Sequence, residues 1–211
     1  NAVKLQKRDN KKLYTKDFYN SLYENRNSYG KTYGEHREKL EFGKKEYDEL
    51  FQYSKELGIT MFSTPFDINS LEFLEQFDCP FYKVASSDIT FLELIKKISE
   101  TGKPIIISTG FSDFEDIDRI MNKISFKNDV AFLQCASAYP ADSNQINLNV
   151  IPEMIRRYPG NIIGYSGHDS GILIPSAAYL MGARIIEKHF TLSRALKGTD
   201  HGMSLEPEGL A

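Results

Sequence analysis

The stretch IIGYSGHDSG, residues 162–171, decides the fold more than any other part of the sequence. It begins as an apolar run typical of a buried strand and then changes to hydroxyl, imidazole and carboxyl side chains. The stretch RIIEKHFT, residues 184–191, repeats the pattern, with an apolar run followed by charged side chains and a histidine. Polar side chains directly after a buried strand indicate a site at the carboxyl end of a parallel sheet.

Short apolar runs of the same kind recur along the whole chain. Seven of them predict strands, at 2–6, 60–64, 81–86, 104–109, 130–137, 161–166 and 184–190. The intervening segments have apolar residues at steps of three and four, which predicts helices at 44–59, 68–79, 90–103, 113–124 and 173–183. Alternating strands and helices require parallel pairing. The chain is therefore expected to form either a doubly wound sheet or a (β/α)8 TIM barrel.

The positions of the polar residues favour the barrel. They follow nearly every predicted strand, whereas a doubly wound sheet concentrates its site at one switch point. Seven units, with the first residue directly in a strand, lead us to expect that the first β/α unit is missing and that residues 1–211 form a partial barrel. We then expect an open slot between the strands at 2–6 and 184–190, or another molecule against those edges.

Composition excludes several classes of protein. The 211 residues are 41% hydrophobic and 26% charged, which is typical of one globular domain. A net charge of -3 gives no basic surface for nucleic acid, and no apolar run approaches the ~20 residues of a membrane span. Cys79 and Cys135 lack CxxC spacing, which favours reduced thiols and a cytoplasmic location.

The connection from residue 7 to residue 43 does not fit the alternating pattern. It is far longer than an ordinary βα loop, and it is polar and rich in Tyr, Asn and Gly. Two interpretations stay open: a partly disordered surface excursion, and a lid or substrate-reading loop. The second is favoured by the string GKTYGEHR, residues 30–37, whose Lys31, Tyr33, His36 and Arg37 could meet an anion.

Eight strings, in order along nearly the whole chain, resemble the N-acetylneuraminate (sialic acid) synthase family. They are VKLQK, FSTPFD, YKVASSD, IISTG, LQCASAYP, IGYSGHDSG, IEKHFTL and KGTDHGMSLEP. Members of that family condense phosphoenolpyruvate with an N-acylmannosamine, or its 6-phosphate, to give a nine-carbon 2-keto acid and phosphate. The resemblance implies a (β/α)8 barrel, a C-terminal antifreeze-protein-like domain outside residues 1–211, and a homodimer.

Phosphoenolpyruvate carries a phosphate and a carboxylate, so its site needs cations and hydroxyl or amide donors. The resemblance places six residues on this substrate: Lys4, Thr64, Lys83, Ser86, Ser108 and Ser166. The residue chemistry agrees, because a lysine that points inward from an apolar strand must find an anion or lose its charge. For each hydroxyl residue, a strand-end or helix-capping role stays open.

His168 and His189 follow neighbouring predicted strands, which would bring two imidazoles together as ligands for a divalent cation. The resemblance implies Mn²⁺, with Mg²⁺ or Co²⁺ as substitutes, acting as a Lewis acid on the sugar aldehyde. Proton transfer is assigned to Glu187 and Asp88. Strand alternation puts Glu187 on the same face as His189, whereas Asp88 could instead be the N-cap of the helix at 90–103.

The sugar is expected to bind through groups that hydrogen-bond its hydroxyl and N-acyl groups. The resemblance places Gln6, Ser137, Tyr139 and Asp200 on that side of the site. It leaves open which acyl sugar binds and whether the sugar is phosphorylated. Two other interpretations also stay open: a different phosphoenolpyruvate- or metal-dependent aldolase-type barrel, and a truncated barrel that binds ligands without catalysis.

Overall fold

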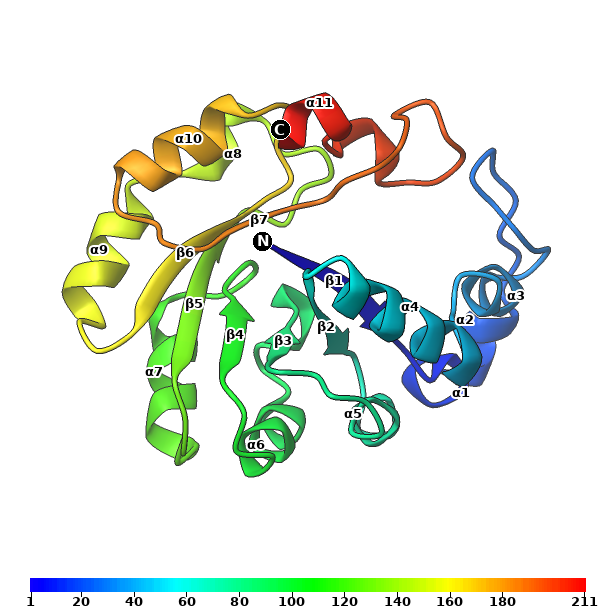
Figure 1. Cartoon of the computed structure of the whole chain (residues 1–211), viewed down its shortest axis with the longest axis horizontal. Coiled ribbons are helices and arrows are strands. Elements are labelled where there is room, and N and C mark those ends of the chain that lie inside the picture. Colours follow the sequence, from blue (N-terminus) through cyan, green and yellow to red (C-terminus); the bar gives the residue numbers. More distant parts are fainter.

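Seven parallel strands form the centre of the structure, a computed structural model that describes all 211 residues. The strands are β1 Ala2–Lys7, β2 Thr60–Pro65, β3 Tyr82–Val84, β4 Ile105–Ser108, β5 Val130–Cys135, β6 Ile162–Gly167 and β7 Ile186–Lys188. Each strand pairs in parallel with the next one along the chain. The sheet curls into a half-barrel with the helices outside it (Figure 1). This consecutive order confirms the predicted strands and excludes the doubly wound alternative.

Six longer helices follow the strands and cover the convex face of the sheet (Figure 1). They are α4 Lys44–Glu56, α5 Ile68–Leu74, α6 Leu92–Glu100, α7 Phe114–Lys123, α9 Val150–Arg157 and α10 Leu173–Leu180. Five of them lie within the predicted helical segments. The exception is α9, which no predicted helical segment covers. The short elements after β3 are the 3-10 turns η1 Ser86–Asp88 and η2 His201–Met203, and the helices α8 Ser143–Ile146 and α11 Pro207–Leu210.

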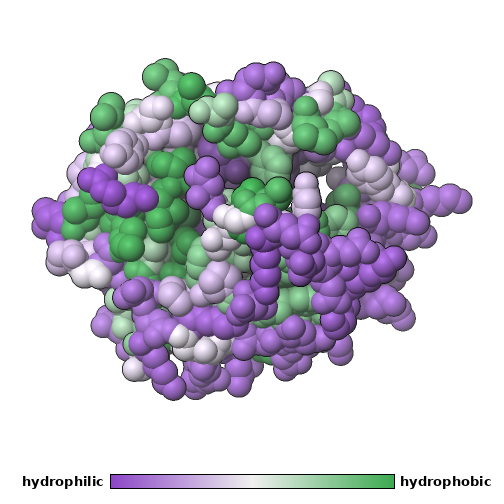
Figure 2. Space-filling view, in the orientation of Figure 1, coloured by the Kyte–Doolittle hydropathy of each residue, from purple (hydrophilic) through white to green (hydrophobic).

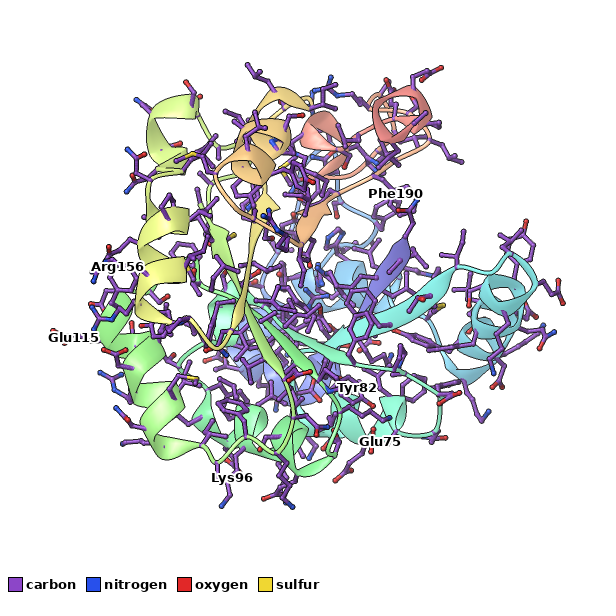
Figure 3. The ribbon with its side chains drawn as sticks, turned by 60° about the vertical axis from the view of Figure 1, so that its left-hand side comes forward. Glu75, Tyr82, Lys96, Glu115, Arg156 and Phe190 are labelled. Atoms are coloured by element: carbon purple, nitrogen blue, oxygen red, sulfur yellow. The ribbon has the colours of Figure 1, made fainter.

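The hydrophobic core lies between the convex face of the sheet and these helices. Alternate strand residues such as Ile107 and Phe132 point outward into a cluster of 29 buried residues, where they meet helix residues such as Leu94 and Ile120. Burying an aliphatic side chain of this size stabilises the fold by about 1.5–3 kcal/mol. The outer faces of the helices carry charged side chains such as Lys96, labelled in Figure 3. This packing leaves the opposite, concave face of the sheet to carry the polar residues.

The segment between β1 and α4 folds onto itself. It carries the short helices α1 Asn10–Leu13, α2 Lys16–Asn20 and α3 Tyr33–Glu38. The rings of Phe18, Tyr23 and His36 pack around Tyr33, with centroids 4.5–6.2 Å away. The interpretation of residues 7–43 as a partly disordered excursion is therefore wrong.

The same segment reaches across to the chain that follows β7. The Tyr29 hydroxyl donates a hydrogen bond of 2.6 Å to the Lys197 carbonyl, and the Gly198 N–H donates one of 3.3 Å to Asn27 Oδ1. The Lys197 ammonium also lies 4.5 Å from the Tyr29 ring centroid. These contacts join loops that follow the first and the last strand, which lie at the two edges of the sheet.

Backbone pairing does not close the sheet. The edge strand β1 pairs only with β2, and the edge strand β7 pairs only with β6. The predicted opening between these two edges is thus present. Figure 3 shows Phe190 just beyond the end of β7, and the residue is 56% exposed. None of the helices has the length and the apolar content that crossing a bilayer requires.

Candidate active site

A cavity of about 310 Å³ lies at the carboxyl ends of the strands. Its residues come from all seven β/α units, although they lie up to 196 positions apart, from Lys4 to Asp200. Thirteen of the fourteen predicted site residues line it: Lys4, Gln6, Thr64, Lys83, Ser86, Ser108, Ser137, Tyr139, Ser166, His168, Glu187, His189 and Asp200. The fold therefore brings the predicted residues together, with Asp88 as the exception.

Lys83 is the most deeply buried cation of the cavity. Its ammonium donates hydrogen bonds to Ser108 Oγ at 2.5 Å and to the Val84 carbonyl at 3.0 Å. The nearest carboxylate oxygen, Glu187 Oε2, is 4.0 Å away. Burial lowers the pKa of Lys83 to about 8, although Glu187 opposes the shift. The charge therefore lacks a close counterion, and an anion entering the cavity would supply one.

Glu187 lies between the two lysines. Its Oε1 is 4.0 Å from the Lys4 ammonium and accepts a hydrogen bond of 3.2 Å from Ser166 Oγ, whose residue is its partner in the β6–β7 register. Burial raises the pKa of Glu187, but Lys83 and Lys4 outweigh burial and lower it to about 2. The carboxylate is thus ionised at neutral pH, which makes it a proton acceptor.

The rings of His168 and His189 face each other with centroids 5.5 Å apart, as strand adjacency predicts. His168 Nδ1 lies 2.8 Å from the Ala136 carbonyl oxygen, and a proton donated there leaves Nε2 as the free nitrogen. The Tyr139 ring packs at 4.0 Å from the His168 ring. No third His, Cys, Asp or Glu side chain completes a cluster that could hold a metal ion. The two imidazoles therefore fit a divalent cation whose other ligands are substrate or water oxygens.

Small residues shape the wall beside Ser86 and Ser137. The Gly110 N–H donates a hydrogen bond of 3.0 Å to Ser86 Oγ. A Cβ on Gly110 would lie 2.1 Å from Ser137 Oγ and 2.7 Å from Ser86 Oγ, so only glycine lets both hydroxyls approach. Thr64 Oγ1 and Ser137 Oγ are buried without a hydrogen-bond partner. These two hydroxyls are free to bind a ligand.

Asp88 does not line the cavity, although Ser86 and Ser87 of the same 3-10 turn do. The helix-capping alternative for Asp88 is wrong, because the N-cap of α6 is Phe91. Burial raises the pKa of Asp88 to about 6, and its Oδ2 is buried without a partner. A role for Asp88 in proton transfer stays a prediction.

The cavity also contains residues that the sequence motifs did not single out. They are Arg8, Phe66, Ala85, Ser87, Phe111 and Cys135. Of the four residues in the predicted anion cluster of GKTYGEHR, only Arg37 reaches the cavity. His36 is instead buried, and its Nδ1 accepts a hydrogen bond of 3.2 Å from the Tyr29 N–H. Arg8 lies two residues after the predicted strand at 2–6, a position that could have marked it as a site residue.

The family model of the NeuB family matches residues 1–211. The chain belongs to this family. It is 41% identical to the N-acetylneuraminate-9-phosphate synthase of Drosophila melanogaster, over 99% of this chain and 57% of that protein. It is 38% identical to the human N-acetylneuraminate-9-phosphate synthase, over 100% of this chain and 59% of the relative. The chain thus spans somewhat less than three fifths of the length of these relatives.

A solved structure has the same architecture. The N-acetylneuraminic acid (sialic acid) synthetase from Leptospira borgpetersenii serovar Hardjo-bovis, in complex with citrate, superposes with a TM-score of 0.86 at 32% identity. The superposition covers 100% of this chain and 69% of that one. The resemblance to the sialic acid synthase family that eight strings indicate is confirmed.

Proposed function

We propose that the intact protein is a sialic acid synthase type transferase. It condenses phosphoenolpyruvate with N-acetylmannosamine, or its 6-phosphate, to give N-acetylneuraminate, or its 9-phosphate, and inorganic phosphate. One observation carries the proposal: two lysines, several serine and threonine hydroxyls and two facing histidines converge in one cavity of about 310 Å³. The names of the curated relatives and of the superposed synthetase support it.

The concave face supplies what phosphoenolpyruvate needs. Lys4 and Lys83 would pair with its phosphate and carboxylate, while Thr64, Ser86, Ser108 and Ser166 donate hydrogen bonds. C3 of phosphoenolpyruvate then attacks the sugar aldehyde, water adds at C2, and phosphate leaves with cleavage of the carbon–oxygen bond. The lysine arrangement favours this substrate, because each ammonium is 4.0 Å from its nearest carboxylate and is free to move toward a closer anion.

Glu187 is the group that we assign to accept the proton of the attacking water. In the free protein both lysines hold it ionised. An anionic substrate on the same lysines competes for their charge, which weakens the stabilisation of the carboxylate and makes it a stronger base. Asp88, whose pKa burial raises to about 6, is the second candidate for proton transfer. It lies in the η1 turn, which also carries the cavity residues Ser86 and Ser87.

His168 and His189 are the residues that would hold a divalent metal, with Mn²⁺ preferred and Mg²⁺ or Co²⁺ as substitutes. Such an ion supplies Lewis acidity at the sugar aldehyde when it is bound. Gln6, Ser137, Tyr139 and Asp200 would orient the sugar beside it. The buried, unpartnered hydroxyl of Ser137 supports this part of the proposal, because it needs an oxygen or nitrogen partner from a ligand.

We propose further that the intact protein contains a (β/α)8 barrel and forms a cytoplasmic homodimer. The unpaired edges of β1 and β7 leave room for an eighth strand. Apolar side chains are exposed over α10, among them Leu173 and Leu180. Figure 2 shows hydrophobic residues at the upper edge of the molecule, where Figure 1 places α10. A second copy that covers this surface would bury it. The two cysteines are free thiols, which fits a reducing compartment. The C-terminal antifreeze-protein-like domain stays a prediction.

The test is phosphate release by the intact protein with phosphoenolpyruvate, Mn²⁺ and each acceptor sugar in turn. Release that requires all three components supports the synthase. Release only with other aldehydes would favour a different phosphoenolpyruvate- or metal-dependent aldolase-type barrel. Binding of phosphoenolpyruvate without release with any acceptor would favour a non-catalytic barrel.

A further inference from the structure

Two of the four cationic side chains of the cavity are not among the residues that we assign to phosphoenolpyruvate. Of the four, only Lys4 and Lys83 share the carboxylate of Glu187. The other two, Arg8 and Arg37, have no carboxylate oxygen within 4.0 Å of their guanidinium groups. Guanidinium groups that line a cavity without a counterion are available to an anionic ligand.

Arg8 is held in place by neutral partners. Its Nη2 donates a hydrogen bond of 2.8 Å to Gln6 Oε1, and its guanidinium lies 3.6 Å from the Phe66 ring centroid. The carboxylate of Glu41, whose charge acts on Arg8, already has other partners. It lies 3.1 Å from the Lys7 ammonium and accepts a hydrogen bond of 3.2 Å from the Arg8 backbone N–H. Burial lowers the pKa of Arg8, and the charge of Arg37 lowers it further. The two guanidinium groups therefore lie close enough to repel each other.

Arg37 approaches from α3. Its Nε is buried and has no hydrogen-bond partner. The helix that carries it is fixed, because Tyr33 and His36 pack into the aromatic cluster around Tyr23, with ring centroids 5.3 and 4.6 Å from the Tyr23 ring. A buried N–H without a partner is costly, and this one lies in a fixed place beside an open cavity. A ligand oxygen would relieve that cost.

Arg8 lies beside one of the residues that we assign to the sugar, because it donates a hydrogen bond of 2.8 Å to Gln6 Oε1. Arg37 lines the same cavity, and its charge acts on Arg8. The predicted phosphoenolpyruvate residues Lys83 and Ser108 instead bond to each other. We propose that Arg8 and Arg37 form a second anion subsite, which binds the phosphate of a phosphorylated sugar acceptor and selects it over the neutral sugar. This inference rests on the proposed synthase function.

The experiment compares acceptors in the intact protein. Calorimetry without phosphoenolpyruvate measures binding of N-acetylmannosamine and of its 6-phosphate, and phosphate release measures kcat/KM for both. The proteins are the wild type, Arg8→Met, Arg37→Met and Arg156→Met. Arg156 is the matched control because it lies on the outer helix α9 and pairs with Glu153 (Figure 3). One lost charge-assisted contact should lower the preference for the phosphorylated acceptor by about ten- to a hundredfold. Arg156→Met should leave that preference unchanged.

Other outcomes separate this inference from the synthase proposal. Absence of phosphate release by the wild type with either sugar counts against the synthase. A wild type that turns over but prefers the neutral sugar overturns the subsite alone. An equal loss with both sugars in the Arg8 and Arg37 variants also overturns it. So does a rise in the KM for phosphoenolpyruvate with an unchanged acceptor preference, because the arginines would then belong to the lysine site. Partial recovery of the preference in Arg8→Lys would support a charge-based subsite.

Discussion

The two faces of the sheet at β6 and β7 both carry buried charges, but the charges are closely paired on one face and loosely paired on the other. On the outer face, the Lys188 ammonium is 3.3 Å from Asp169 Oδ2, and both side chains are 4% exposed. The Tyr165 hydroxyl donates a hydrogen bond of 2.6 Å to Asp169 Oδ1. The Lys188 ammonium donates a hydrogen bond to the backbone carbonyl of Asp169. On the inner face, Glu187 lies 4.0 Å from each of Lys4 and Lys83.

This difference shows how alternating residues of the same two strands can serve stability on one face and ligand binding on the other. In both strands the backbone alternates, so Ser166, His168 and Glu187 face the cavity while Asp169 and Lys188 face the helices. The outer pair has the shorter ion-pair distance and both of its side chains are almost fully buried, which indicates a structural role. The inner group has longer distances and one surplus cation, which indicates a place for an anion. The variants below are chosen to break one face and leave the other intact.

Breaking the outer pair should have the largest effect. Lys188→Met leaves Asp169 buried without its cation, which typically costs roughly 3–5 kcal/mol of stability. The measurement is the free energy of unfolding in a denaturant titration, with Lys83→Met as the control from the inner face. Lys83→Met removes a cation whose burial is already unfavourable, so its loss of stability should be much smaller. If Lys188→Met unfolds like the wild type, the outer pair is not structural.

Removing either of the two facing histidines should have the second largest effect. His168→Ala or His189→Ala takes away one of the two imidazoles that we propose as metal ligands, so Mn²⁺ affinity should fall by more than about a hundredfold. Metal-dependent phosphate release by the intact protein should disappear with it. Circular dichroism should show an unchanged fold, because both rings line the cavity and neither belongs to the hydrophobic core between the sheet and the helices. Retention of metal affinity by both variants would show that the histidines are not the ligands.

Removing the inner lysine should weaken substrate binding without unfolding the protein. A charge-assisted contact is worth roughly 1.5–3 kcal/mol, so Lys83→Met should weaken phosphoenolpyruvate binding by about ten- to a hundredfold. Calorimetry with the intact protein measures the change. An unchanged affinity would move the anion site away from Lys83.

The smallest effect is a pH dependence that belongs to the inner face alone. With a pKa of about 8, Lys83 loses its proton as the pH rises through 8, so phosphoenolpyruvate binding should weaken by about tenfold between pH 7 and 9. Stability should change in the opposite direction. The folded pKa lies below the unfolded value of about 10.4, so the contribution of Lys83 to stability increases between pH 8 and 10.4.

Lys83→Arg is the control for this pH profile, because a guanidinium stays charged throughout the range. Its phosphoenolpyruvate affinity, measured by calorimetry at each pH, should be nearly flat between pH 7 and 9. A wild-type affinity that is equally flat would mean that Lys83 is not the titrating contact.

The sequence predicts the sheet and most of the cavity for a simple reason. Strand periodicity fixes the face of each residue and places the end of each strand within two residues. The spacing of Glu187 and His189 alone therefore places them on one face. β3 ends at Val84 rather than at Ser86, because Ser86 begins the η1 turn. Asp88 lies in the same turn and does not line the cavity, which strand spacing cannot foresee.

Features that depend on contacts between distant segments could not be predicted from local patterns. The 7–43 segment owes its fold to rings such as Tyr23, Tyr33 and His36, and their packing follows no period. Arg8 and Arg37 meet in the cavity only because that segment folds back over β1. Gly110 likewise matters because Ser86 and Ser137, 51 positions apart, converge on it. The fold of the 7–43 segment, the position of the two arginines and the role of Gly110 all depend on contacts between residues that are distant in the sequence.

The central claim is that the loosely paired charges of the concave face are the phosphoenolpyruvate site. A crystal structure of the intact protein with phosphoenolpyruvate and Mn²⁺ tests it most directly. We expect substrate oxygens within hydrogen-bonding distance of Lys83 Nζ and Ser108 Oγ, with the ion bound by His168 and His189 and the Lys188–Asp169 pair unchanged. Phosphoenolpyruvate bound elsewhere, with the 4.0 Å distances from Glu187 to Lys4 and Lys83 unaltered, would contradict the claim.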